Sequence, residues 1–311
     1  MKEVLPGIFQ MTLTLSGFNP NSVNIYLIRT GNYFTIVDTG WEFPAAIESM
    51  ENQLSEIGAR FTDIKQILIT HFHIDHLGMM AKFKGSHDVK IYLPQNEIEL
   101  LKIRYTGGDN YLPLTDKFLQ NHGFPAAELT PPEFRLPIPE NLVSTKIDVL
   151  LRGGEEIRAG EYVFKVVNTP GHTPGHVGYY EPSHKFIISG DMLLPTIATN
   201  AAFHVQHMRN PLQQYLNSLR ILRELDINLI LPGHEYIFSN HRQRIDELIC
   251  HHQEKAAEIW QVLADRQPRT AYAISRVLSW SPQSKTTVWD NLSGWDKRFA
   301  VLQTIAHLEE R

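Results

Sequence analysis

The chain has 311 residues, 42% of them hydrophobic and 20% charged, which is ordinary for a globular protein with one large and one small domain. Its formal net charge of −5 gives no basic field for nucleic acid, and its single cysteine, Cys250, leaves metal binding to histidines and carboxylates. No apolar run is long enough for a membrane helix and Pro6-Gly7 interrupts any signal peptide, so we expect a cytoplasmic protein that does not contact membranes.

The first predicted elements alternate between strand and helix. Two apolar runs, residues 23–28 and 33–37, flank a Thr-Gly-Asn turn and predict a β-hairpin. A helix over residues 43–57 follows, and short buried strands are expected at residues 67–70 and 89–93. This alternation is typical of a layered α/β fold.

The alternation resumes after residue 160. Further strands are predicted at residues 162–167, 177–180, 186–189 and 229–231. Before the last strand, Pro211 stands where the first turn of a helix accepts proline, and Tyr215 and several leucines follow at helical spacing. We expect this helix to pack on the sheet.

Two segments break the pattern. Residues 95–146 are rich in proline and glycine, with short helical patterns between, and we interpret them as an insertion and a candidate lid. After about residue 240 the pattern becomes all-helical. Residues 245–263 carry an apolar stripe, and shorter helices are expected at residues 270–280 and 296–309.

Four potential metal ligands stand in six residues directly after the strand predicted at residues 67–70. His71 and His73 point the same way, because side chains two apart in an extended chain share a face, and they can share one metal. Asp75 and His76 lie in the turn into a helix and can bind a second ion a few ångströms away, as two-metal hydrolytic sites require. The alternative is a coincidental histidine-rich turn.

Later strands also end in candidate ligands. A tight Pro-Gly turn exposes His172, which can complete the three-histidine site, while we expect His176 to support the turn or a carboxylate by a hydrogen bond rather than to be a ligand. Asp191 follows an apolar strand and could bridge both ions, or simply cap the strand. His234 repeats the arrangement of strand, Pro-Gly and His, so it is the natural last ligand of the second site.

Two other features have different expected roles. Asp38 also ends a strand at this edge, and we expect it to accept a hydrogen bond from a ligand rather than to bind metal. The doublet His251-His252 is in helical register with apolar neighbours, which indicates packing or surface.

These motifs resemble the metallo-β-lactamase superfamily, of the glyoxalase II type. The His-x-His-x-Asp-His signature, the Pro-Gly-His-Thr-x-Gly-His segment, Gly-Asp and the late Gly-His occur in family order over about residues 5–240. The resemblance implies a catalytic domain at residues 1–240, built as a four-layer αββα sandwich with its site on one sheet edge. The implied first metal binds His71, His73 and His172, the second binds Asp75, His76 and His234, and Asp191 bridges them.

Residues 241–311 resemble the small winged-helix-like domain that follows this fold in a subgroup including lactamase-like endoribonucleases. The segment has 10 Lys and Arg against 9 Asp and Glu, a net charge of +1, which is poor for touching phosphates. We expect it to cover the edge of the pocket or to form a homodimer surface. Because every candidate ligand lies at or before His234, we also expect metal binding to survive deletion of this segment.

Two departures from the family narrow the activity. Leu194 and its neighbours offer no hydroxyl where lactone-opening relatives place a tyrosine just after the bridging Asp. The β-lactamases proper use a cysteine ligand and no bridging Asp, whereas here Asp191 is present and Cys250 lies in the helical tail. Neither lactonase nor β-lactamase activity is favoured.

We therefore expect a metal-dependent hydrolase with two divalent ions, zinc by default, in which a hydroxide shared by the ions attacks the substrate and catalytic Asp75 orients it. The favoured substrate is a small ester, thioester or amide. The alternatives are a phosphodiesterase or endoribonuclease acting on single-stranded nucleic acid, and a non-catalytic binding or dimerisation protein. The candidate substrate contacts are Arg104, Tyr105, His204, His207 and Arg209.

Overall fold

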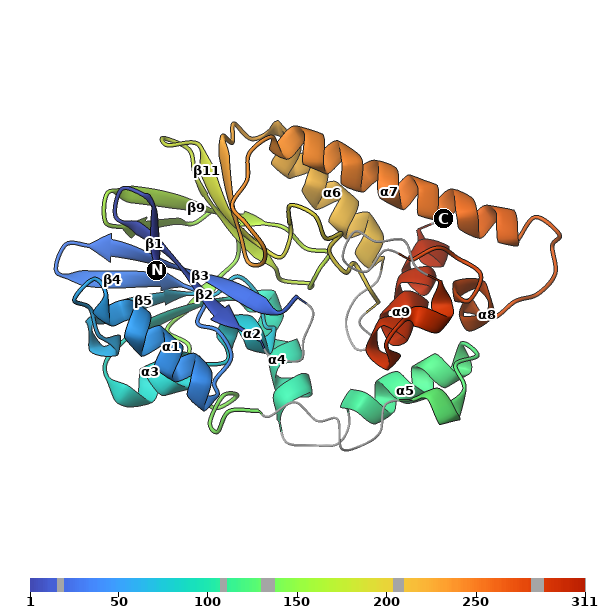
Figure 1. Ribbon diagram of the computed structural model, residues 1–311, viewed down its shortest axis with the longest axis horizontal. Coiled ribbons are helices and arrows are strands. Elements are labelled where there is room, and N and C mark those ends of the chain that lie inside the picture. Colours follow the sequence, from blue (N-terminus) through green and yellow to red (C-terminus); the bar gives the residue numbers. More distant parts are fainter. Residues whose placement is uncertain (16–19, 107–110, 130–137, 204–209, 281–287, 311) are drawn as a thin grey trace.

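The computed structural model describes residues 1–15, 20–106, 111–129, 138–203, 210–280 and 288–310. Two β-sheets lie face to face, and helices cover the outer face of each (Figure 1). The predicted four-layer αββα sandwich is therefore confirmed.

Seven strands form the first sheet in chain order. They are β1 (Lys2–Leu5), β2 (Ile8–Thr14), β3 (Ser22–Thr30), β4 (Tyr33–Val37), β5 (Ile64–Leu68), β6 (Lys90–Pro94) and β7 (Val149–Leu151). The second sheet has the order β12-β11-β10-β9-β8. Its strands are β8 (Glu156–Ala159), β9 (Tyr162–Asn168), β10 (Val177–Glu181), β11 (Phe186–Gly190) and β12 (Leu229–Pro232).

The helices follow the same order along the chain. They are α1 (Pro44–Ser55), α2 (Ile74–Leu77), α3 (Met80–Ser86), α4 (Ile98–Tyr105), α5 (Tyr111–Asn121), α6 (Pro211–Glu224), α7 (His241–Val262), α8 (Ala271–Ser275) and α9 (Gly294–Glu309). Single 3-10 turns occur at Phe61–Asp63, Gln95–Glu97, Ala126–Glu128 and Trp289–Asn291. None of the helices in the described part of the chain is long and apolar enough to cross a membrane.

Three apolar layers hold the sandwich together. One face of the first sheet packs on α1 and α3, through residues such as Met50 and Phe83. Its other face packs on the second sheet, where Tyr26 and Tyr179 are both buried. The outer face of the second sheet packs on α6 and α7, as the leucines at helical spacing after Pro211 predict.

Parallel pairing brings the functional segments to one edge. β4 and β5 run parallel, so the residues after Val37 and after Leu68 leave the sheet at the same end. β11 and β12 are also parallel, and their register pairs Gly190 with Pro232. Because the carboxyl ends of parallel strands meet at one edge, Asp191 and the Gly-His turn after Pro232 become neighbours.

Several elements differ from the prediction. β1, β2, β7 and β8 were not predicted, and β5 ends before Thr70. The helix expected at residues 270–280 ends as α8 at Ser275, because the indole N–H of Trp280 donates to the Ser275 carbonyl at 2.8 Å and so satisfies an acceptor that further helix would use. The described residues after Asn240 form helices and turns without a strand of a wing, so the winged-helix likeness stays a prediction.

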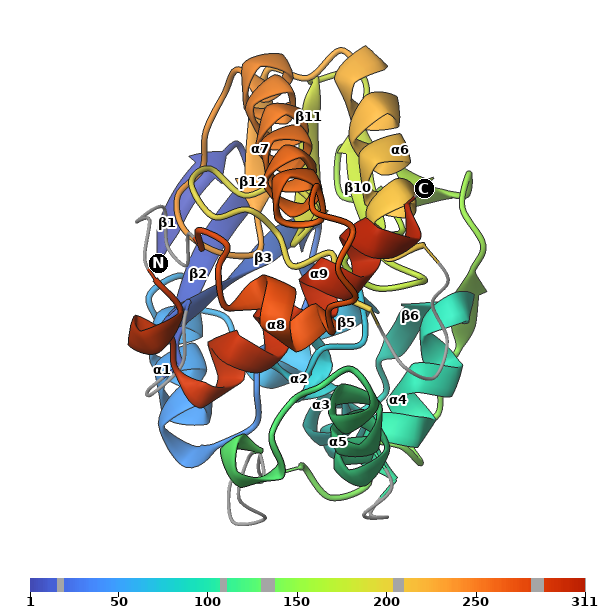
Figure 2. The same cartoon turned by 90° about the vertical axis from the view of Figure 1, so that its right-hand side faces the viewer.

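The segment at residues 95–146 does not stand alone, because α5 packs on the C-terminal helices (Figure 2). Leu119 and Phe124 share one apolar cluster with Ile274 and Val301. An ion pair joins the half-buried Asp116 of α5 to the buried Arg298 of α9. Whether this segment acts as a lid stays a prediction.

We predict that Leu119→Ala lowers the free energy of unfolding by about 2–5 kcal/mol, because it removes a fully buried side chain from that cluster. Leu114→Ala on the same helix is the matched control, since Leu114 is 47% exposed and its replacement should change stability by less than about 0.5 kcal/mol. Chemical denaturation of both variants measures the difference. Equal stability losses would mean that α5 is not docked as described.

Candidate metal centre

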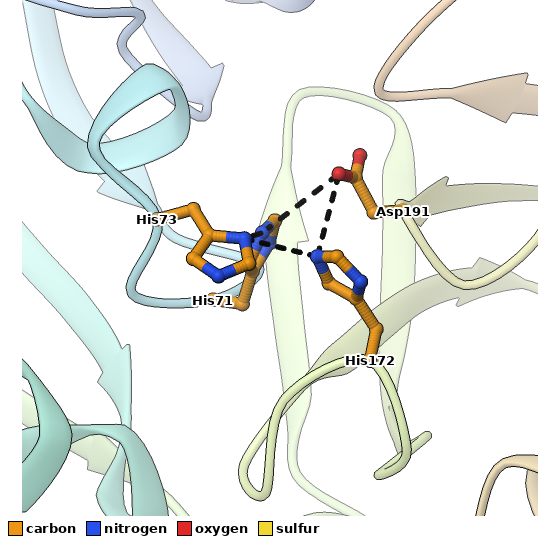
Figure 3. A group of neighbouring side chains, drawn as sticks. All are labelled: His71, His73, His172 and Asp191. Atoms are coloured by element: carbon orange, nitrogen blue, oxygen red, sulfur yellow. Dashed lines mark hydrogen bonds and ion pairs between the residues drawn. The ribbon is translucent and has the colours of Figure 1, made fainter. Parts of the chain in front are cut away.

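Four candidate ligands from three loops meet at the edge of the sandwich. The donor atoms of His71, His73, His172 and Asp191 all lie within 4.8 Å of one another. The Nδ1 atom of His73 is 3.0 Å from the Nε2 atoms of both His71 and His172. Figure 3 shows the three rings and the carboxylate turned toward one shared point.

A second group lies directly beside the first and contains Asp75, His76 and His234. The Nε2 atoms of the two histidines are 3.4 Å apart, and Asp75 Oδ2 is 3.5 Å from His234 Nε2. Asp75 and His76 belong to the single turn of α2, as predicted from the sequence.

Asp191 stands between the two groups. Its Oδ2 atom lies 3.5 Å from His172 Nε2 in the first group and 3.3 Å from His234 Nε2 in the second. Burial acts to raise the pKa of Asp191, but His234 and His76 outweigh it and hold that pKa well below its ordinary value. An ionised carboxylate in this position could bridge two cations.

Asp38 organises two of the histidines from behind. Its carboxylate accepts the hydroxyl of Thr70 at 2.8 Å and lies 2.8 Å from Nδ1 of His76. Since the Thr70 hydroxyl is used in this way, its oxygen can accept from Nδ1 of His71, 2.9 Å away. Asp38 holds this position with a φ of 61°, a left-handed conformation of the kind that persists at functional sites.

Backbone carbonyls orient two further rings. Nδ1 of His234 lies 2.6 Å from the carbonyl oxygen of Ser22, and Nδ1 of His172 lies 3.3 Å from that of Asn200. A carbonyl can only accept, so in both rings Nδ1 carries the proton and Nε2 presents its lone pair to the centre.

His176 contacts the backbone of the candidate bridge. Its Nε2 accepts the backbone N–H of Asp191 at 3.1 Å, and its Nδ1 lies 2.8 Å from the Thr169 hydroxyl. Burial lowers the pKa of His176 well below its ordinary value, which keeps Nε2 available as an acceptor. Gly190 makes this approach feasible, since a Cβ there would lie 2.6 Å from His176 Nε2.

Glu97 is a functional candidate that sequence reasoning missed. Its buried carboxylate accepts the backbone N–H of Phe72 at 2.8 Å and that of Gly175, and so joins the two loops that carry His71, His73 and His172. Burial raises the pKa of Glu97 to about 7 against the lowering effect of these hydrogen bonds. In the sequence it is one glutamate among many, with no motif around it.

The donor set fits divalent ions. Nδ1 of both His76 and His234 is held from outside, so both Nε2 atoms point into the centre, 3.4 Å apart, where one cation could bind both. Histidines bound tetrahedrally to one zinc at about 2.0–2.1 Å stand about 3.3 Å apart, close to the spacing found here. Burial lowers the pKa of His76, but Asp191, Asp75 and Asp38 outweigh it and raise the pKa well above its ordinary value, so protons compete for this position.

A cavity of about 380 Å³ opens over both groups. Its floor includes His73, Asp75 and Asp191, and its far wall is built by α7, α9 and the segment around Trp280. Aromatic and aliphatic side chains dominate that wall. They include Trp280, Leu292, Trp295, Phe299 and Leu302.

The candidate substrate contacts fall into two sets. Arg104 and Tyr105 both line the cavity, whereas His204, His207 and Arg209 lie outside the described residues.

The doublet on α7 has two roles in the structure. His252 is buried with its ring 5.5 Å from that of Tyr215, as expected for packing, but both His251 and His252 also line the cavity. Their place in the wall was not predicted.

Comparison with known proteins identifies the family. The sequence model of the metallo-beta-lactamase superfamily matches residues 18–234, which include every candidate ligand. This chain belongs to that superfamily.

Relatives extend the likeness to the C-terminal helices. A probable metallo-hydrolase of Bacillus subtilis is 24% identical over 282 residues, which cover 84% of this chain and 82% of the relative. The hydroxyacylglutathione hydrolase of Bdellovibrio bacteriovorus is 25% identical over 179 residues, which cover 57% of this chain and 52% of the relative. The crystal structure of a metallo-beta-lactamase family protein from Thermus thermophilus superposes with a TM-score of 0.82 at 27% identity, covering 99% of this chain and 94% of that one. Together with the site, these relatives support a metal-dependent hydrolase.

We predict a pH effect from Glu97 in metal-free protein. Its pKa of about 7 when folded exceeds the ordinary 4.5, so Glu97 contributes stability that is complete below about pH 4.5 and lost as the pH rises through 7. The free energy of unfolding of the native protein should therefore fall over this window relative to Glu97→Gln, by at most about 3 kcal/mol. Denaturation at several pH values measures this difference. Parallel curves of unfolding free energy against pH for these two proteins would contradict the assignment. As a control, the curve of Glu247→Gln, a substitution at an exposed residue, should run parallel to that of the native protein.

Proposed function

We propose that this protein is a two-metal hydrolase of a small ester, thioester or amide, with zinc as the metal. The observation that carries the proposal is that two complete donor groups, joined by Asp191, open on a cavity with a largely apolar wall. In this proposal His71, His73 and His172 hold one ion and Asp75, His76 and His234 hold the other. Asp38 and His176 orient the ligands by hydrogen bonds.

Two divalent ions in such a centre supply a nucleophile from water at neutral pH and polarise the substrate oxygen. The chain's own residues do the positioning. Asp75 is the most exposed of the second group, with 24% of its side chain accessible, and it lines the cavity. We assign to Asp75 the orientation of the attacking water and the acceptance of its proton.

The wall of the cavity supports a small, partly apolar substrate. The C-terminal helices contribute two cationic side chains to this wall, and both are already paired. Lys255 pairs with Glu258 at 2.9 Å, and Arg298 pairs with Asp116. They are therefore not arranged as a track for phosphates, and a nucleic-acid substrate has less support. The relative named hydroxyacylglutathione hydrolase acts, by its name, on an acyl compound, which is in the proposed class.

We predict that the purified protein binds two zinc or comparable divalent ions per chain, because two donor groups are present. Removing the metal with a chelator should abolish hydrolysis and lower the melting temperature, since an ion that binds only the folded state stabilises it. Elemental analysis and thermal unfolding before and after metal is restored are the measurements. Protein that takes up no metal under either condition would contradict the proposal.

We predict that Asp191→Asn reduces hydrolysis by more than the roughly 10–100-fold typical of residues that only support ligands, because it weakens both sites at once. Asp246→Asn is the matched control, since Asp246 pairs with Arg223 on the surface, and it should leave activity and metal content unchanged. A panel of thioesters, esters, amides, lactones, phosphodiesters and short single-stranded RNA identifies the substrate class. Turnover of RNA alone would favour the alternative function.

A further inference from the structure

The loop that follows the candidate bridge lies between the metal centre and the C-terminal helices. This segment, residues 191–203, starts at Asp191, contains the carbonyl that orients His172, and lines the cavity. We propose that α7 and α9 set the geometry of the metal centre by holding this loop through Arg244 and Gln303. Both are positioning residues, and the proposal rests on the proposed metal centre.

Arg244 of α7 holds the first half of the loop. Its Nε donates to the Leu194 carbonyl at 2.8 Å and its Nη2 to the Ile197 carbonyl at 3.0 Å. Only 14% of its side chain is exposed. Because the guanidinium is planar, its two bonds fix the relative position of two carbonyls three residues apart, which a single ammonium could not do.

Gln303 of α9 holds the second half. Its Nε2 donates to Asn200 Oδ1 at 2.9 Å. The backbone oxygen of the same asparagine is the one that lies 3.3 Å from Nδ1 of His172. Two hydrogen bonds therefore separate a C-terminal helix from a candidate metal ligand.

The catalytic domain holds the same loop from the opposite side. Glu235, next to His234, accepts the backbone N–H of Thr196 at 3.0 Å and that of Ile197 at 3.2 Å. The hydroxyl of Thr199 donates back to the carbonyl of Asp191. The loop is thus held both by the catalytic domain and by α7 and α9.

This arrangement changes the expectation for the C-terminal segment. Among the described residues the candidate ligands all precede this segment, but its Arg244 and Gln303 hold the loop that follows Asp191 and orients His172. Groups that orient metal ligands typically change metal affinity by about 10–100-fold when they are removed. The C-terminal helices should therefore influence metal binding, and deletion should not leave it intact.

The test compares two arginines of α7 in the full-length protein. Arg244→Met removes both bonds to the loop, while Arg242→Met removes two similar bonds to the carbonyls of Arg223 and Leu225, outside the loop. Zinc affinity is measured by competition with a chelator of known affinity. Melting temperatures are recorded for the metal-free and zinc-loaded forms of each variant.

We expect Arg244→Met to weaken zinc binding about 10-fold or more and to reduce the rise in melting temperature that zinc produces. The zinc affinity of Arg242→Met should stay within about twofold of the native value.

A second pair of variants tests the contact from α9 without changing Arg244. Asn200→Ala loses the acceptor of Gln303 and should weaken zinc binding, whereas Asn200→Asp keeps an acceptor and should retain it.

Zinc affinity unchanged in both Arg244→Met and Asn200→Ala would overturn the inference. So would an equal fall in the melting temperatures of the metal-free and zinc-loaded forms, because that marks a purely structural role. If the native protein binds no zinc at all, the proposed function itself fails, which is a separate result.

Discussion

The hydrogen bond on the outer nitrogen of four candidate ligands, His71, His76, His172 and His234, is the constraint on which this site depends. A hydrogen bond on the other nitrogen fixes which nitrogen of a histidine presents its lone pair to a metal, and here the acceptors come from widely separated parts of the chain. Ser22 begins β3 in the first sheet, Asp38 follows β4, and Asn200 lies in the loop after β11 of the second sheet. The two sheets must therefore be assembled in register before the donor atoms converge.

The structure brings together residues that the sequence analysis singled out, because they stand at or just after strand ends. His172 and His234 each follow a short apolar run and a Pro-Gly turn, so both local structure and chemistry are visible there in a few letters. The supporting residues leave no such trace. Asn200 and Ser22 act through backbone carbonyls, which every residue possesses, and Glu97 becomes informative only when two distant loops meet at it.

The same distinction explains the errors in secondary structure. The long helices and central strands have strong periodicity and lie within a few residues of their predicted bounds. The short outer strands β1, β7 and β8 carry too few residues for a pattern. The end of α8 depends on a side chain five positions further along the chain, whose contact forms only after folding. Trp280 reaches back to the Ser275 carbonyl, a contact that depends on the packing of the C-terminal helices.

The docking of α5 on α8 and α9 has a consequence for how the protein is made. A ribosome adds roughly 5–20 residues per second, so α5 leaves the exit tunnel well before the helices on which it packs. Until α8 and α9 emerge, Leu119 and Phe124 lack most of their apolar partners in that cluster. The catalytic sheets can form during this interval, whereas the cavity wall is completed only late in translation, and nascent chains should offer a hydrophobic surface to chaperones at α5.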